Sequence, residues 1–171
     1  MQDVFDNKVI GIVQNNSIDY LDSVFQFLVN QNQFVPLRSK SFCQKIDYLH
    51  FDSVLIPGNK TGWYSPKFNL PHNNDIAQIS FTSGTEGEPK GILLTHNQLG
   101  DTVSRLLEVM QISSEIKEYI GVPVYHSFGY GRIRVCNQVG GKAFIPSTGF
   151  NPQEIATMLA NDEINSISAV P

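Results

Sequence analysis

The chain has 171 residues, of which 41% are hydrophobic and 16% are charged, and its formal net charge is -4. This length is enough for one domain with a hydrophobic core and short for two, and the composition is typical of a globular rather than a disordered protein. Lys and Arg do not cluster, so no nucleic-acid partner is expected. The sequence contains neither a run long enough to span a membrane nor a signal peptide, and we predict a cytoplasmic protein.

The two cysteines, Cys43 and Cys136, lie far apart in the sequence. A secreted domain could pair them, but two small buried thiols in a reducing compartment are the stronger interpretation. There is no Cys-x-x-Cys pair, and no two histidines have metal-ligand spacing on one helix, so we predict no metal ligands. Cys136 is expected to be a small core residue on a helix rather than a nucleophile.

Short apolar runs and amphipathic stretches alternate through the first half of the chain. Such runs are typical of buried strands, whereas residues 18–30 repeat apolar side chains at helical spacing. The resulting predictions are strands at 8–14, 34–37, 53–56 and 76–82, a helix at 18–30 and a candidate helix at 41–50. Residues 57–74 are rich in Gly, Pro, Asn and Lys, which predicts an irregular loop.

The same alternation continues in the second half. Strands are predicted at 119–124, 143–145 and 164–170, helices at 96–111 and 151–162, and a candidate helix that follows Gly129 and Gly131 and ends at Val139. The pattern predicts an α/β fold with a mainly parallel sheet flanked by helices. The chain ends on an apolar stretch, whereas a domain end is more often polar and exposed, so we expect it to be part of a longer protein.

Residues 81–91, with the sequence FTSGTEGEPKG, follow a predicted strand and carry the strongest chemical signal. Their glycines permit positive φ angles and close approach of the backbone to an anion, and consecutive N–H groups in such a turn can form an anion-binding nest. The hydroxyl groups and one lysine add donors for phosphate. The segment is not a Walker loop, which requires Gly-Lys-Ser/Thr, because Lys90 follows Pro89. Elsewhere in the chain, Gly141-Lys142 also fails this pattern, because Ala143 follows it. The alternative is an ordinary polar hairpin turn.

This segment resembles the signature loop of the adenylate-forming superfamily, which includes acyl-CoA synthetases, luciferases and the adenylation domains of peptide synthetases. That loop reads Thr-Ser-Gly-Thr-Thr-Gly-x-Pro-Lys-Gly, and the chain matches every fixed position except Glu86, which replaces a threonine. Residues 123–129 (PVYHSFG) are similar to the family's Pro-x-Phe-His-x-x-Gly motif. Residues 9–36, 92–97, 140–143, 150–154 and 166–171 also follow the family in order. The resemblance covers most of the chain, although only the loop is highly specific.

The resemblance implies that the loop binds the β- and γ-phosphates of ATP through Thr82, Ser83, Gly84, Thr85, Gly87 and Lys90. The family's reaction joins a carboxylic acid to AMP with release of pyrophosphate, and the acyl group then passes to coenzyme A or a carrier protein. Catalysis rests on positioning and charge neutralisation, with Mg²⁺ assisting. A carboxylate at Glu86 is unfavourable beside phosphates unless it faces solvent or helps to hold the metal.

His126 is implied as the catalytic residue at the carboxylate end of the acyl pocket, with Phe128 and Tyr130 as candidate lining residues. The alternative for His126 is a structural histidine with a backbone partner. The pairs Asp19/Asp22 and Glu115/Glu118 are expected on solvated helix faces.

The family's residues for adenine, ribose and magnesium, and the lysine of its C-terminal domain, have no counterpart here. Residues 1–171 are therefore predicted to be part of the large N-terminal, AMP-binding domain of a ligase. The alternatives are a truncated, non-catalytic module that binds a nucleotide or a partner, and a purely structural fragment.

Overall fold

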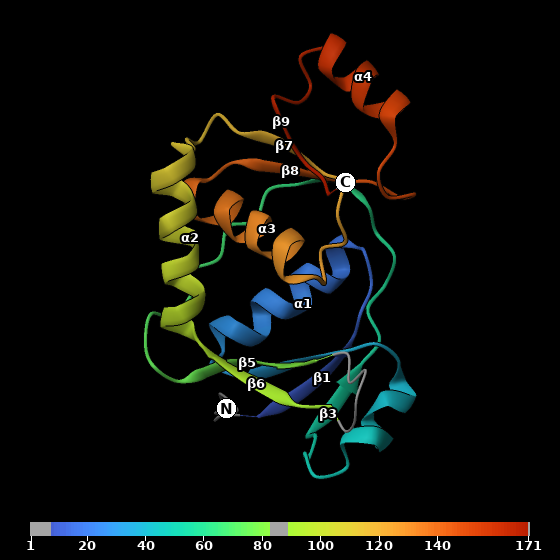
Figure 1. Ribbon diagram of the computed structural model, residues 1–171, viewed down its shortest axis with the longest axis vertical. Coiled ribbons are helices and arrows are strands. Elements are labelled where there is room, and N and C mark those ends of the chain that lie inside the picture. Colours follow the sequence, from blue (N-terminus) through green and yellow to red (C-terminus); the bar gives the residue numbers. More distant parts are fainter. Residues whose placement is uncertain (1–7, 83–88, 171) are drawn as a thin grey trace, which may run out of the picture. The chain divides into compact units, whose positions relative to one another are not determined.

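The computed structural model of this chain describes residues 8–82 and 89–170 (Figure 1). The chain forms two compact units built from interleaved segments. The first unit consists of Met1–Gln14, Asp22–Pro57 and Asn69–Gly100, and the second of Asn15–Leu21, Gly58–Phe68 and Asp101–Pro171. Helices α1 (Ile18–Val29) and α2 (His96–Met110) each contribute residues to both units.

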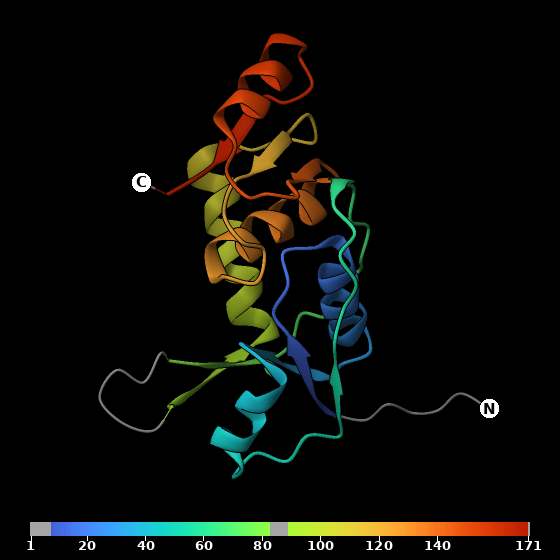
Figure 2. The same ribbon diagram turned by 90° about the vertical axis from the view of Figure 1, so that its right-hand side faces the viewer.

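The first unit is built on a five-stranded sheet in the order β3-β1-β2-β5-β6. Neighbours are parallel except β5 and β6, which are antiparallel (Figure 2). The strands are β1 (Val9–Val13), β2 (Gln33–Leu37), β3 (Ser53–Leu55), β5 (Ile76–Phe81) and β6 (Gly91–Thr95). The apolar runs of β1 and β2 are largely buried, as is typical of inner strands of a parallel sheet.

A short helical segment follows β2 and joins the core of this unit. The sequence favoured a helix at 41–50, and the structure instead has the 3₁₀ helix η1 at Lys40–Ile46. Its last residue, Ile46, is fully buried with Val35, Leu37 and Ile79. A single buried residue in seven does not provide the apolar stripe that a longer helix needs, which accounts for the early end.

The second unit contains a separate four-stranded sheet in the order β4-β8-β7-β9. Strand β7 pairs in parallel with β8 and β9, and β4 is antiparallel to β8. The bounds are β4 (Gly62–Tyr64), β7 (Lys117–Ile120), β8 (Lys142–Ile145) and β9 (Ser166–Ser168). The predicted α/β class is confirmed, with its strands divided between two mainly parallel sheets. The prediction of an unbroken loop at 57–74 is wrong at β4, a three-residue edge strand too short for a periodic signal.

Two helices belong entirely to the second unit. Helix α4 (Pro152–Ala160) begins one residue after and ends two residues before the predicted bounds. Asn151 is its N-cap, and the Asn151 Oδ1 atom accepts hydrogen bonds from the N–H groups of Gln153 and Glu154, at 3.1 and 3.2 Å. Helix α3 (Ser127–Val139) includes both glycines that were expected to precede it. A Cβ atom at Gly129 would lie 2.4 Å from the Pro123 carbonyl oxygen, so close backbone approach requires glycine there.

An ion pair is buried between β7 and α3. Glu118 and Arg132 are both almost fully buried, and the guanidinium contacts the carboxylate with two nitrogens, Nε to Oε1 at 2.7 Å and Nη2 to Oε2 at 2.9 Å. The Ser168 hydroxyl on β9 hydrogen-bonds to the same carboxylate. The expectation of a solvated helix face is therefore wrong for Glu118, whereas Glu115 is exposed in a turn. A charge can be buried on a strand when a partner on another element neutralises it.

Replacing Arg132 with Met should leave the Glu118 carboxylate buried without a cation. We expect the free energy of unfolding to fall by about 3–5 kcal/mol, measured by urea denaturation. Arg105→Met, at an exposed position on α2, is the matched control and should cost less than about 0.5 kcal/mol. The double variant Glu118→Leu/Arg132→Leu should recover much of the loss. Equal losses in Arg132→Met and Arg105→Met would contradict a stabilising role for the pair.

Both cysteines are free thiols, and Cys136 is buried on α3, as predicted, whereas Cys43, which was also expected to be buried, is only half-buried. Burial and the nearby Glu118 carboxylate raise the pKa of the Cys136 thiol to about 12. Because only the thiolate is nucleophilic, we expect Cys136 in the folded Cys43→Ser variant to react with a maleimide at pH 8 on the order of 1,000-fold more slowly than in urea. Equal rates in the two conditions would contradict this assignment.

Candidate functional site

The predicted phosphate-binding segment lies at the turn between β5 and β6. Phe81 pairs with Gly91 at the last position of the antiparallel ladder. One step beyond, the Thr82 N–H donates to the Lys90 carbonyl oxygen at 3.1 Å, and the Lys90 N–H donates to Thr82 Oγ1 at 3.4 Å. The structure therefore brings two of the six predicted phosphate contacts, Thr82 and Lys90, to opposite sides of one hairpin. The other four, Ser83, Gly84, Thr85 and Gly87, lie outside the described residues, as does Glu86.

Both described contacts are accessible. Thr82 and Lys90 are exposed, and no carboxylate of residues 8–82 or 89–170 forms an ion pair with Lys90. A lysine ammonium in this setting can bind a phosphate oxygen as a mobile point charge. The paired main chain at the base of the hairpin fixes where that side chain begins.

An aromatic cluster from the segment after β2 supports the hairpin. The Tyr48 ring meets Phe81 edge to face at a centroid distance of 6.4 Å, and Phe42 meets Phe81 at 6.0 Å. The Tyr48 hydroxyl donates a hydrogen bond to the Pro89 carbonyl oxygen at 2.9 Å. Sequence reasoning missed Tyr48, because it precedes the loop by about forty residues and no local pattern links the two.

His126 lies in the second unit, as the N-cap residue of α3. Its backbone N–H donates to the Pro123 carbonyl oxygen at 3.1 Å, and its side chain makes no capping hydrogen bond. The imidazole is exposed and its centroid lies 4.7 Å from the Tyr125 ring. An exposed imidazole at the start of a helix is available to a ligand, although its catalytic role stays a prediction.

The two candidate lining residues near His126 differ in exposure. Phe128 is 44% exposed, whereas Tyr130 is buried and its hydroxyl accepts a hydrogen bond from Arg134 Nη1 at 3.3 Å. Burial raises the pKa of Tyr130. Phe128 can therefore contact a ligand directly, and Tyr130 packs within the unit.

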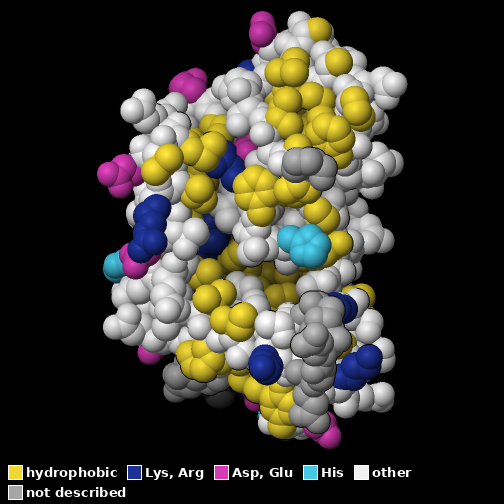
Figure 3. All heavy atoms as spheres, viewed as in Figure 1, with side chains coloured by type: hydrophobic (Ala, Val, Ile, Leu, Met, Phe, Trp, Pro, Cys, Tyr) yellow, Lys and Arg dark blue, Asp and Glu magenta, His cyan; other side chains and the backbone are white. Residues whose placement is uncertain are grey.

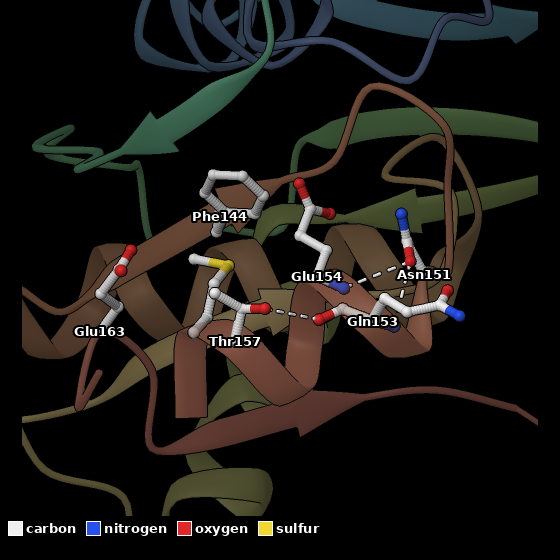
Figure 4. A pocket seen from close by; sticks show the side chains of 7 residues that line it. Phe144, Asn151, Gln153, Glu154, Thr157 and Glu163 are labelled. Atoms are coloured by element: carbon white, nitrogen blue, oxygen red, sulfur yellow. Dashed lines mark hydrogen bonds between the residues drawn. The ribbon is translucent and has the colours of Figure 1, made fainter. Parts of the chain in front are cut away.

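An open pocket of about 470 Å³ lies between α4 and β8 in the second unit (Figure 4). Its wall contains two carboxylates and no lysine or arginine, and its lining residues are Phe144, Asn151, Gln153, Glu154, Thr157, Met158 and Glu163. The Tyr119 hydroxyl donates to Glu154 Oε2 at 2.7 Å, and burial together with this carboxylate raises the pKa of Tyr119. The carboxylates disfavour a polyphosphate here, and none of the predicted site residues lines this pocket.

Three wider properties of the described residues concern metal ions, membranes and charged surfaces. Within residues 8–82 and 89–170, no three His, Cys, Asp or Glu side chains converge as a metal site would require. None of the helices in the described part of the chain has the length and apolar character needed to cross a bilayer. On the face shown in Figure 3, the visible Lys and Arg side chains of described residues are interspersed with other groups and form no continuous stripe.

Known sequences agree with the resemblance seen in the loop. The profile of the AMP-binding enzyme family matches residues 21–171. Over 106 residues the chain is 29% identical to a putative acyl-CoA synthetase, YngI, of Bacillus subtilis, covering 61% of this chain and 19% of that protein. It is 28% identical over 102 residues to the acyl-CoA ligase sidI of Aspergillus fumigatus, covering 58% and 17% respectively.

Solved structures show the same fold. A long-chain-fatty-acid-CoA ligase, FadD1, from Archaeoglobus fulgidus superposes with a TM-score of 0.69 at 20% identity, over 96% of this chain and 40% of that one. ATP-bound MatB from Rhodopseudomonas palustris gives 0.71 at 17% identity, over 95% and 39%. The chain belongs to the AMP-binding enzyme family, and it spans about a fifth of the length of these curated relatives.

Proposed function

We propose that this chain is the phosphate-binding part of an ATP-dependent acid–thiol ligase. The observation that carries the proposal is the hairpin, where a near-complete family signature coincides with an exposed threonine and lysine held opposite each other across paired main chain. Membership of the AMP-binding family supports the same conclusion. The ATP-bound state of the structural neighbour MatB supports ATP as the nucleotide.

The proposed reaction has two steps. A carboxylate oxygen of the acid attacks the α-phosphorus of ATP, an O–P bond forms, the bond to the bridging oxygen breaks, and pyrophosphate leaves. The sulfur of a thiol then bonds to the acyl carbon, the bond from that carbon to the phosphate oxygen of AMP breaks, the thiol proton is released, and AMP leaves. Coenzyme A is supported by the acyl-CoA synthetase and ligase names of the relatives, and a carrier protein is the other acceptor.

Lys90 would neutralise charge on the β- and γ-phosphates and on the departing pyrophosphate, which is where negative charge accumulates. Thr82, with Ser83, Gly84, Thr85 and Gly87, would supply hydroxyl and backbone donors. Mg²⁺ would reach the site with the nucleotide, bound chiefly by phosphate oxygens and water. Residues that complete the adenine and ribose contacts would come from beyond this chain.

The second candidate function is a non-catalytic nucleotide-binding module. The specific observation in its favour is Glu86, which places a carboxylate within the signature. ATP–pyrophosphate exchange with a panel of carboxylic acids separates the two candidates when it is measured on this chain together with the residues that complete the adenine and ribose contacts, because exchange requires formation of the adenylate. Binding of Mg-ATP without exchange would favour the module.

Replacing Lys90 with Ala should weaken Mg-ATP binding by about tenfold to a hundredfold, since a charge-assisted contact contributes about 1.5–3 kcal/mol. Isothermal titration calorimetry measures the change. Lys67→Ala is the matched control, because Lys67 is another exposed lysine, placed in the second unit. Wild-type affinity in the Lys90 variant would contradict the assignment of this loop as the phosphate-binding site.

His126→Ala should lower the rate of acid-dependent exchange by about a hundredfold or more if His126 acts at the carboxylate. The affinity for Mg-ATP should stay within about twofold, because the proposed phosphate contacts lie in the hairpin. His50→Ala, at an exposed position in the first unit, serves as control. An exchange rate equal to that of this control would favour the structural interpretation of His126.

A further inference from the structure

We propose that Tyr48 is a positioning residue for phosphate binding: it orients the peptide group from which Lys90 extends. The inference rests on the proposed function of the hairpin and adds a residue that lies outside the family signature. Its basis is the hydrogen bond from the Tyr48 hydroxyl to the Pro89 carbonyl oxygen at 2.9 Å.

The bonded carbonyl belongs to the Pro89–Lys90 peptide group. Because a peptide group is planar and rigid, its carbonyl oxygen and the Lys90 N–H point in opposite directions within one plane. Tyr48 holds the oxygen, and Thr82 Oγ1 accepts from the N–H at 3.4 Å. The Lys90 carbonyl on the next peptide group accepts from the Thr82 N–H at 3.1 Å. The backbone on both sides of the Lys90 Cα is therefore restrained.

Of these contacts, the Tyr48 bond has the better length. The distance of 2.9 Å lies within the usual range for an O–H···O bond, whereas 3.4 Å lies beyond the usual range for an N–H···O bond. Pro89 has no N–H with which to restrain the segment further. Loss of the Tyr48 hydroxyl would thus leave the Pro89–Lys90 peptide group held mainly by the long hydrogen bond from the Lys90 N–H to Thr82 Oγ1.

The position of Tyr48 is itself fixed by the core of the first unit. Ile46 is fully buried, and the Leu49 N–H donates to the Ile46 carbonyl oxygen at 3.0 Å, so the chain around Tyr48 is anchored. The ring meets Phe81 edge to face. Yet Tyr48 is 63% exposed, and so exposed a ring gains little from burial. Its hydroxyl contact is thus the main restraint that it supplies to the hairpin.

Tyr48→Phe tests this role, because it removes the hydroxyl and keeps the ring against Phe81. We expect Mg-ATP to bind about threefold to tenfold more weakly, the effect of one neutral hydrogen bond. The melting temperature should stay within about 2 °C of wild type, since the contact is exposed. Amide hydrogen exchange, followed by NMR, should accelerate at Thr82 and Lys90 and stay unchanged at Ile79.

Two variants separate the outcomes. Tyr119→Phe removes a buried tyrosine hydroxyl that contacts Glu154 and the Gly149 carbonyl oxygen in the second unit, and should leave both Mg-ATP affinity and exchange at Lys90 unchanged. Lys90→Ala reports on the phosphate site itself.

Weaker binding in Lys90→Ala with wild-type affinity in Tyr48→Phe would overturn the role of Tyr48 and leave the proposed function standing. Amide exchange is measured without ligand, and an unchanged rate at Lys90 in Tyr48→Phe would show that the Tyr48 hydroxyl does not restrain the Lys90 backbone, which would overturn the inference. Failure of the wild-type chain to bind Mg-ATP, or wild-type affinity in Lys90→Ala, would overturn the proposed phosphate site and the inference with it.

Discussion

A buried carboxylate is stable only when a cation and hydrogen-bond donors replace the water that it loses, and the second unit is arranged around that requirement. Glu118 on β7 is met by Arg132 on α3 and by Ser168 on β9. The Arg132 Nη1 atom also lies 3.1 Å from the Met110 sulfur at the end of α2. One charged pair thus links the inner strand, the edge strand and two helices. Because the guanidinium fork fits the carboxylate in one orientation, it also restrains the rotation of α3, and therefore the start of that helix at His126.

The first unit depends on a different constraint, the change of strand direction between β5 and β6. Four strands of its sheet run parallel, and β6 alone returns against its neighbour. Only an antiparallel pair can place both ends of a short turn beside each other. This return is what sets Thr82 opposite Lys90. A parallel connection would require a crossover of a dozen or more residues and would separate the two side chains.

Local sequence patterns predicted most of the elements, because apolar runs and helical spacing record burial directly. The predicted helices at 18–30, 96–111 and 151–162 overlap the observed helices, and every observed strand except β4 and β6 overlaps a predicted one. Two of the misses, β4 and Glu118, depend on contacts with residues later in the chain. Strand β4 is stabilised by pairing with β8, some eighty residues later in the chain. The local sequence predicts a surface position for Glu118, because its buried partner, Arg132, lies fourteen residues later in the chain. Glycines within α3 oppose a helix locally, and the backbone contact at Pro123 requires one of them.

In the candidate site, too, local patterns predict some residues and miss others. The signature residues are contiguous, so a linear pattern finds them, and the chemistry of glycine, hydroxyl and lysine side chains points to phosphate. Tyr48 is not contiguous, and nothing in residues 40–50 suggests an association with the loop. Signature residues supply the groups that contact a phosphate. Residues such as Tyr48 hold those groups in place, so that they reorganise less when the phosphate binds. Preorganisation of this kind affects affinity without adding a contact to the ligand. Two chains with the same signature can therefore bind the same nucleotide with different affinities, and the cause is then to be sought in the side chains behind the loop.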